Sequence, residues 1–167
     1  MSTSTPREAA PDRDRERRHA QLAIDQALLC RGNARVGVVI ARGEDVLATG
    51  FKDDSSGRHA EQVALQAAKD AGIDVAGAEL YTTLEPCANS RTRRTPCCQL
   101  VAEAGIVTVH IGEYDRNPQI YRLGWKNLRD SGVVLRDFPA DLREAAQQAN
   151  ADFATVFTEG TGMSAGA

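Results

Sequence analysis

Apolar residues recur every three or four positions in five stretches of the chain, a spacing that places them on one face of a helix. The first stretch has this pattern at Ala20, Ala23, Ile24, Ala27 and Leu28. The predicted helices cover about residues 14–31, 59–71, 96–104, 119–131 and 140–157. Polar residues occupy most of the remaining positions in these stretches, so each helix is expected to bury one face against another layer.

Short, nearly continuous apolar runs lie between the predicted helices and indicate buried strands. The predicted strands cover about residues 36–41, 46–51, 79–84, 106–111 and 133–135. A turn at residues 43–45 joins the first two runs and predicts an antiparallel hairpin. The later runs alternate with helices, which implies parallel crossovers with helices on both faces of the sheet. The sequence therefore predicts an α/β fold, a three-layer α/β/α sandwich around a five-stranded mixed sheet.

Length and composition fit a single domain with two short tails. We predict disordered tails at residues 1–12 and 159–167 around one domain at 13–158. A net charge of −3 and few aromatic residues (4 Phe, 3 Tyr and 1 Trp) argue against a polynucleotide partner. No apolar run approaches the length of a membrane span or of a signal-peptide core, so no membrane association is expected and the predicted location is cytoplasmic.

Two cysteines and a histidine motif carry the chemistry. The second predicted helix begins with His59-Ala60-Glu61, and Cys87 and Cys97 each follow a proline. One imidazole and two thiolates fill three corners of a tetrahedral Zn²⁺ site and leave the fourth for water, which is the catalytic arrangement. H-x-E followed by P-C-x-x-C is the signature of zinc nucleobase deaminases. Here nine residues separate the two cysteines, a longer interval than in that signature.

The predicted ligands His59, Cys87 and Cys97 come together where two predicted helices begin. The positive ends of helices favour thiolates, so both cysteines are suited to bind a metal. Glu61, two residues after the histidine, is the predicted catalytic residue. It would accept a proton from the zinc-activated water and deliver it to a ring nitrogen or to the departing amine, leaving a carbonyl.

Cys98 leaves two alternatives open. It would be the third ligand in place of Cys97, or it would be a fourth ligand in a purely structural zinc site. Cys97 is preferred because it follows a proline as Cys87 does, and a structural site would leave Glu61 without a role. Of the other histidines, His110 is predicted to be structural and His19 to lie at the surface.

With three further segments, these motifs resemble the pyrimidine deaminase domain of riboflavin biosynthesis, a member of the cytidine deaminase-like superfamily. The segments are Asn33–Gly37, Thr83–Cys87 and Asp115–Gln119. The resemblance implies a cytidine deaminase-like fold with Zn²⁺ as the cofactor. It also implies that Asn33 and Asn117 face a small aminopyrimidine, a diaminopyrimidinone that carries a ribosylamino 5′-phosphate. A homodimer or higher homo-oligomer is implied as well.

The loop after Cys87 departs from the pattern of that family, in which it touches the substrate. It is one residue longer and has Ala88-Asn89-Ser90-Arg91 where the family has Ser-His-x-Gly. Asn89, Arg91 and Arg94 are therefore candidate substrate-binding residues. The arginines either hold a substrate phosphate through bidentate bonds or belong to a solvated loop. The changed loop leaves open deamination of cytosine, a cytosine nucleoside or nucleotide, guanine or a specialised aminopyrimidine. A third interpretation is an inactive, zinc-stabilised interaction domain.

Overall fold

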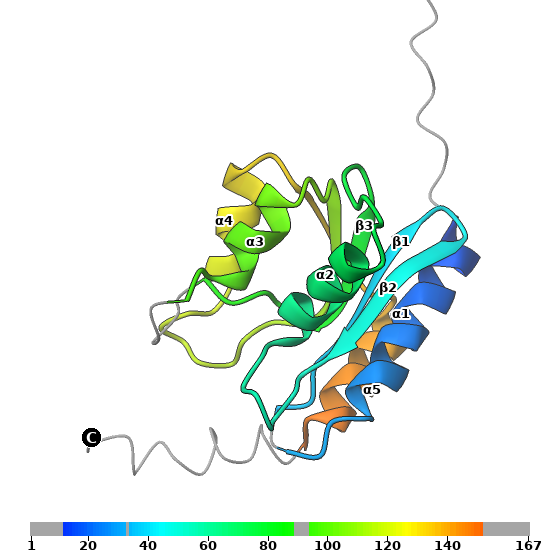
Figure 1. The fold of residues 1–167 in the computed structure, drawn as a ribbon. Helices are drawn as coiled ribbons and strands as arrows, with labels where there is room; N and C mark the ends of the chain where they lie inside the picture. Colours follow the sequence, from blue (N-terminus) through cyan, green and yellow to red (C-terminus); the bar gives the residue numbers. More distant parts are fainter. Residues whose placement is uncertain (1–11, 33, 89–93, 152–167) are drawn as a thin grey trace, which may run out of the picture.

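The computed structural model describes residues 12–32, 34–88 and 94–151, which form five strands and five helices in the predicted order (Figure 1). The elements are α1 (Arg13–Ala27), β1 (Gly37–Arg42), β2 (Asp45–Phe51), α2 (Ala60–Asp70), β3 (Glu79–Leu84), α3 (Cys97–Glu103), β4 (Thr108–Glu113), α4 (Leu123–Asp130), β5 (Val134–Asp137) and α5 (Ala140–Ala149). Within these ranges no helix is long and apolar enough to cross a membrane. The predicted tails lie outside the described residues except for Asp12, whose side chain accepts a hydrogen bond from the Arg15 amide at the start of α1.

The five strands form one mixed sheet in the order β2-β1-β3-β4-β5. The hairpin pairs β1 with β2, and β1 also runs antiparallel to β3. The pairs β3–β4 and β4–β5 are parallel, because α3 and α4 return the chain to the same edge of the sheet. The predicted five-stranded mixed sheet is confirmed, and the carboxyl end of β3 leads into the segment that contains Cys87.

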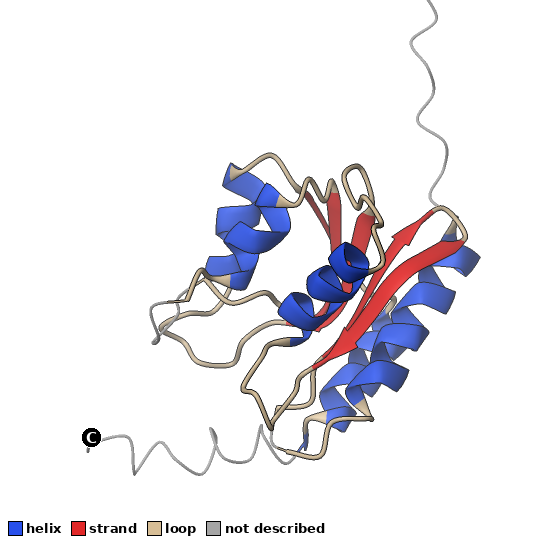
Figure 2. Ribbon diagram, viewed as in Figure 1, coloured by secondary structure: helices blue, strands red, loops and turns tan. Residues whose placement is uncertain are grey.

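Helices cover both faces of the sheet, as Figure 2 shows. Alternate residues of β1 point to opposite sides, so that Val38 and Ile40 join the apolar core beneath α2, α3 and α4. Val39 and Ala41 join the second core, beneath α1 and α5. The predicted three-layer α/β/α sandwich is therefore confirmed.

Gly50 of β2 allows the start of α2 to lie directly on the sheet. A Cβ atom at this position would lie 2.6 Å from the backbone oxygen of Ala60 and 2.7 Å from the backbone nitrogen of Ala64. Such distances are shorter than real Cβ contacts, so only glycine permits this close approach of helix and strand. The contact holds the first turn of α2, which contains Glu61, at a fixed height above the sheet.

Two helix boundaries differ from the sequence prediction for local reasons. The fourth helix begins at Leu123 rather than near residue 119, because Arg122 takes a left-handed backbone conformation with a φ of 57°. The first helix ends at Ala27, where the amides of Leu29 and Cys30 bond to carbonyls three residues back instead of four. The predicted end of the last helix, residue 157, lies outside the described residues.

A buried polar cluster ties the central strands together on the α1 face. His110 Nε2 lies 2.7 Å from a Glu79 carboxylate oxygen, and the Tyr81 hydroxyl donates to the same oxygen at 3.1 Å. The Tyr81 and His110 rings stack with centroids 4.1 Å apart. His110 is thus buried and hydrogen-bonded, as predicted for a structural residue. The surface prediction for His19 is wrong, since it is 4% exposed and its Nε2 lies 2.9 Å from the Gly43 carbonyl oxygen.

Glu79→Gln is expected to destabilise the fold in a pH-dependent way. The hydrogen bond from His110 lowers the pKa of Glu79 from 4.5 to about 2. A carboxyl group whose pKa is lower in the folded state contributes stability above its unfolded pKa, and this contribution is lost as the pH falls through the folded pKa. We expect Glu79→Gln to lower the free energy of unfolding by about 1–2 kcal/mol at neutral pH, a value discounted for a side chain that is 30% exposed.

The measurement is urea denaturation of the wild type and Glu79→Gln at several pH values. The difference between the two proteins should shrink from pH 4.5 down to about 2, the interval between the unfolded and folded pKa values. Glu103→Gln, which changes an exposed carboxylate, is the control and should show little difference at any pH. A difference that did not vary with pH would contradict this account.

Candidate functional site

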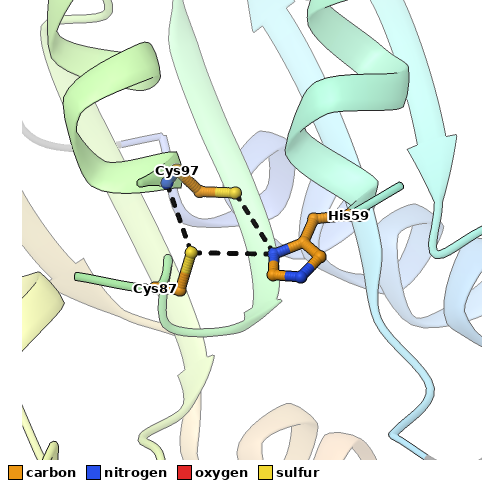
Figure 3. A group of neighbouring side chains, drawn as sticks. All are labelled: His59, Cys87 and Cys97. Carbon is orange, nitrogen blue, oxygen red and sulfur yellow. Dashed lines mark hydrogen bonds between the residues drawn. The ribbon is translucent and has the colours of Figure 1, made fainter. Parts of the chain in front are cut away.

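The sequence-predicted metal ligands meet at one end of the sheet, where two helices begin. His59 is the N-cap residue of α2, and its amide donates to the side-chain oxygen of Gln62 at 2.9 Å. Cys97 is the first residue of α3, and Cys87 lies in the loop that follows β3. Figure 3 shows the three side chains pointing toward a common point from these elements. The predicted meeting of two helix starts is therefore present in the structure.

The three donor atoms have the spacing that a tetrahedral metal requires. His59 Nδ1 lies 3.6 Å from Cys87 Sγ and 3.4 Å from Cys97 Sγ, and all three donor atoms lie within 4.8 Å of one another (Figure 3). Zinc bonds of ordinary length at tetrahedral angles place nitrogen and sulfur ligands about 3.5 Å apart, and two sulfurs about 3.8 Å apart. The residues present thus fit Zn²⁺ in both chemistry and spacing. They supply three ligands, as in catalytic sites, rather than four.

The two thiols differ in acidity because of their hydrogen bonds. Hydrogen bonding to the Cys97 side chain, to His59 and to the Cys97 amide lowers the pKa of Cys87 to about 4, and that amide lies 3.3 Å from Cys87 Sγ. The same contact with Cys87, together with burial, raises the pKa of Cys97. The hydrogen bond to Cys87 also raises the pKa of His59. The surroundings of Cys87 therefore favour the thiolate form, and metal binding at this site would be accompanied by proton release, since cysteine binds zinc as a thiolate.

Glu61 lies in the first turn of α2 beside this group and is only 4% exposed. Burial disfavours its charged form and raises its pKa to about 7. A carboxyl group with a pKa near neutrality can both accept and return a proton at physiological pH. The predicted catalytic residue therefore has the acidity that a proton carrier needs.

A cavity of about 220 Å³ opens beside these residues and includes His59, Glu61 and Cys87 in its wall. Among the described residues, the lining consists of Ala34, Val36, Lys52, His59, Ala60, Glu61, Leu84, Glu85, Cys87 and Asp115. His59 is exposed whereas Cys97 is buried, so the metal-binding group is reached from the histidine side. The cavity, the buried acid and the metal-binding group thus form one continuous site.

The predicted substrate-binding residues that the structure describes, Arg94 and Asn117, are not part of the cavity lining. Arg94 is exposed, and its guanidinium donates to the Gly57 carbonyl oxygen at 3.1 Å. It lines a separate hollow of about 430 Å³, formed mainly by residues of α2 together with Leu100 of α3. The Asn117 side-chain oxygen accepts the Gln119 amide at 3.0 Å, and Asn117 is not among the residues that line the cavity. Asn33, Asn89 and Arg91 lie outside the described residues, and the binding roles of all five stay predictions.

Cys98 does not belong to the metal-binding group. It lies near Asn127, whose side-chain nitrogen is 3.9 Å from its sulfur, in a different hollow of the surface. Among the described residues, the cluster with metal-ligand spacing contains Cys97 and not Cys98. This placement agrees with the preference for Cys97 that was drawn from its position after a proline.

Sequence reasoning missed three charged residues in the cavity wall: Lys52, Glu85 and Asp115. Glu85 and Asp115 stand inside the segments that carry the resemblance, and that position was an available signal. Lys52 follows β2 immediately and has no motif around it. Only the three-dimensional arrangement brings Lys52 to the cavity.

Comparison with known proteins places this geometry in a family. The family profile of the cytidine and deoxycytidylate deaminase zinc-binding region matches residues 13–113. The chain belongs to the cytidine and deoxycytidylate deaminase family. Zinc is the cofactor of the matched region, and the His and Cys residues grouped here are suited to bind it. The predicted cytidine deaminase-like fold and the predicted cofactor are thereby confirmed.

Individual members of the deaminase family show how far the likeness extends. The chain is 38% identical over 124 residues to the riboflavin biosynthesis protein RibD of Actinobacillus pleuropneumoniae, a match that covers 74% of this chain and 32% of the relative. The crystal structure of the Thermotoga maritima diaminohydroxyphosphoribosylaminopyrimidine deaminase/5-amino-6-(5-phosphoribosylamino)uracil reductase superposes with a TM-score of 0.79 at 31% identity, over 88% of this chain and 42% of that one. The dCMP deaminase of cyanophage S-TIM5 shares the fold, with a TM-score of 0.62 at 21% identity, over 77% of this chain and 98% of that one. The chain thus spans about a third of the length of the curated RibD proteins that it matches.

Proposed function

We propose that this protein is a zinc-dependent hydrolytic deaminase that converts an exocyclic amine of a small aminopyrimidine to a carbonyl and releases ammonia. In this proposal His59, Cys87 and Cys97 hold the zinc and Glu61 is the proton carrier. The observation that carries it is the placement of the buried Glu61 and the three donor atoms around one cavity. An interaction domain would have no use for a buried carboxyl group with a pKa near 7 beside such a cluster.

The chemistry follows from the positions of these side chains. Zinc at this site supplies Lewis-acid activation, which lowers the pKa of water toward neutrality. Glu61 accepts the proton from the attacking water, and the oxygen forms a bond to the ring carbon that bears the amine. Glu61 then returns this proton to the ring nitrogen and carries the proton of the newly formed hydroxyl group to the amine, so that the carbon–nitrogen bond breaks, ammonia leaves and the carbonyl forms. Water is consumed, and ammonia and the carbonyl compound are formed.

For the substrate we propose a riboflavin-type diaminopyrimidinone that carries a ribosylamino phosphate. Support comes from the RibD proteins that the chain matches at 30–41% identity. The cavity wall adds a chemical argument, because Asp115 can accept hydrogen bonds from amino groups and Lys52 can donate to a carbonyl or phosphate oxygen. Lys52 also forms an ion pair with Asp54 at 3.3 Å, which holds the lysine at the cavity.

A homo-oligomer that works in the cytoplasm remains part of this proposal. The resemblance to the riboflavin-pathway domain supports both statements. Light scattering of the purified protein would test the assembly, since a mass equal to that of one chain would contradict it.

Ammonia release by the purified, zinc-loaded protein tests the proposed function. The panel contains the riboflavin diaminopyrimidinone phosphate, its dephosphorylated form, cytosine, cytidine, CMP, dCMP and guanine. We expect turnover of the riboflavin intermediate, with a weaker reaction when its phosphate is removed. Turnover of a cytosine compound or of guanine instead would keep the deaminase chemistry but overturn the proposed substrate. A zinc-loaded protein that releases ammonia from none of these compounds would contradict the proposal as a whole.

A further inference from the structure

Glu85 is a buried carboxylate with an unusual set of partners. It follows β3 immediately and is 5% exposed. One of its carboxylate oxygens accepts the backbone amides of Asp115 at 2.8 Å and Arg122 at 3.0 Å, and the other accepts the Trp125 amide at 3.3 Å. A carboxylate that accepts several amides in a buried setting forms strong, directional bonds. The hydrogen bonds of the Glu85 carboxylate thus go to the backbone of a segment that begins thirty residues further along the chain.

The three amides belong to the segment that leads from the cavity wall into α4. Asp115 lines the cavity, Arg122 is the residue before α4, and Trp125 lies in the first turn of that helix. The same segment is pressed against the chain beside Glu85, because a Cβ atom at Gly124 would overlap the carbonyl oxygen of Pro86. The side chain of Glu85 and the backbone of Pro86 together hold this segment in place.

The position of Glu85 in the sequence links this segment to the metal-binding group. Cys87 is two residues away, and its sulfur lies 3.6 Å from His59 Nδ1. Backbone bonds fix the link at both ends, since the Glu85 amide donates to the Glu113 carbonyl oxygen at 2.8 Å and the Cys98 amide donates to the Cys87 carbonyl oxygen at 3.1 Å. In the stretch 85–87, Glu85 therefore holds the cavity wall and Cys87 supplies a sulfur to the metal-binding group.

We propose that Glu85 is a positioning residue that sets the distance between the cavity wall at Asp115 and the metal-binding group. This inference rests on the proposed function and adds a determinant of substrate affinity to it. One oxygen of the Asp115 carboxylate accepts the Asn117 amide at 2.9 Å, and the other would accept a hydrogen bond from an amino group of a bound pyrimidine. Glu85 holds the backbone of Asp115 through the Asp115 amide. Loss of the three hydrogen bonds to Glu85 would move the cavity wall at Asp115 while the metal ligands stay in place. Such small displacements weaken productive binding.

Glu85→Gln tests the proposal with nearly the same side-chain shape. The amide replaces one acceptor oxygen by an NH₂ group, which cannot accept a backbone amide. We expect zinc content and the absorption spectrum of the cobalt-substituted protein to match the wild type, while KM for the best substrate of the panel rises about tenfold or more and kcat changes less. Hydrogen exchange measured by NMR should become faster at the Asp115, Arg122 and Trp125 amides.

Glu113→Gln is the matched control. Glu113 is also 5% exposed and holds Arg116 through a bond of 2.7 Å, but it does not line the cavity. Its substitution removes a buried carboxylate from the neighbouring strand, and we expect no faster exchange at the three amides and an unchanged KM. If Glu85→Gln does not fold, Glu85→Asp takes its place, because it keeps the charge but shortens the reach.

Unchanged exchange at the three amides in the Glu85 variant would overturn the proposal, and so would an unchanged KM despite faster exchange. An equal rise of KM in Glu113→Gln would also overturn it, since the effect would then be general destabilisation. The exchange measurement needs no substrate. A wild type that is inactive on the whole panel would therefore contradict the proposed function. The exchange rates would still test whether Glu85 holds the three amides.

Discussion

Glu61→Gln is expected to reduce kcat by about 10²–10⁴-fold while zinc content and melting temperature stay close to those of the wild type. The amide keeps the shape of the side chain but cannot accept the proton of the attacking water. Glu61 is buried beside the metal-binding group, and its burial raises its pKa to about 7. For the variant to remain active, another acid in the described part of the cavity would have to accept the proton. The other acids of the lining are Glu85, which is occupied by three amides, and Asp115.

The measurement is steady-state ammonia release with the best substrate of the panel, together with zinc analysis of the same samples. Glu79→Gln is the control, because it changes a carboxylate on the opposite face of the sheet and should leave kcat unaltered. Activity within a few-fold of the wild type in Glu61→Gln would show that the proton travels by another route. Loss of zinc from this variant would instead assign Glu61 to metal binding.

Cys97→Ala is expected to lower the zinc affinity by about 10²-fold or more, whereas Cys98→Ala should keep the metal. The two cysteines are neighbours in sequence and both are buried. Comparing the two variants therefore separates the effect of losing a metal ligand from the effect of losing a buried side chain. Only Cys97 brings its sulfur within 3.4 Å of His59 Nδ1, and Cys98 contacts Asn127 instead. Removal of one thiolate leaves two protein ligands, which is too few for a stable zinc site.

Zinc per chain, measured after dialysis against a weak chelator, distinguishes the two variants. The melting temperature should follow the same order, because a ligand that binds only the folded state stabilises it, by about 2.7 kcal/mol at a concentration of one hundred times Kd. Chelator should lower the melting temperature of the wild type and of Cys98→Ala and should have little effect on Cys97→Ala. Retention of zinc in Cys97→Ala with loss in Cys98→Ala would reverse the assignment of the third ligand.

The fold could be predicted well because its strands are short apolar runs and its helices have clear periodicity. The metal-binding group could be predicted because few side chains bind zinc, and each stood next to a predicted helix or strand end. Errors arose where tertiary contacts decide the outcome. His19 stands in a highly charged helix, and nothing in that pattern shows that its ring lies against the Gly43 carbonyl. The bond of Arg94 to the Gly57 carbonyl is likewise a tertiary contact that the sequence does not show, and the binding role of Arg94 stays a prediction.

The role of Glu85 could not be predicted for a related reason. Its partners are backbone amides thirty to forty residues further along the chain, and backbone amides leave no mark on a sequence. Lys52 presents the same difficulty, because a lysine after a strand is ordinarily a solvated residue. Motifs therefore indicated the metal-binding group, whereas the wall of the neighbouring cavity depends on the packing of distant segments.

The layer formed by α1 and α5 contributes no residue to the described lining of the cavity, although it covers a whole face of the sheet. That separation makes this face a convenient place for a spectroscopic probe. A fluorophore on an exposed position of α1, such as Gln21, would report unfolding without touching substrate or metal. The same sample could then give folding and turnover as independent signals, and variants of the cavity could be compared without confusing a damaged fold with damaged chemistry.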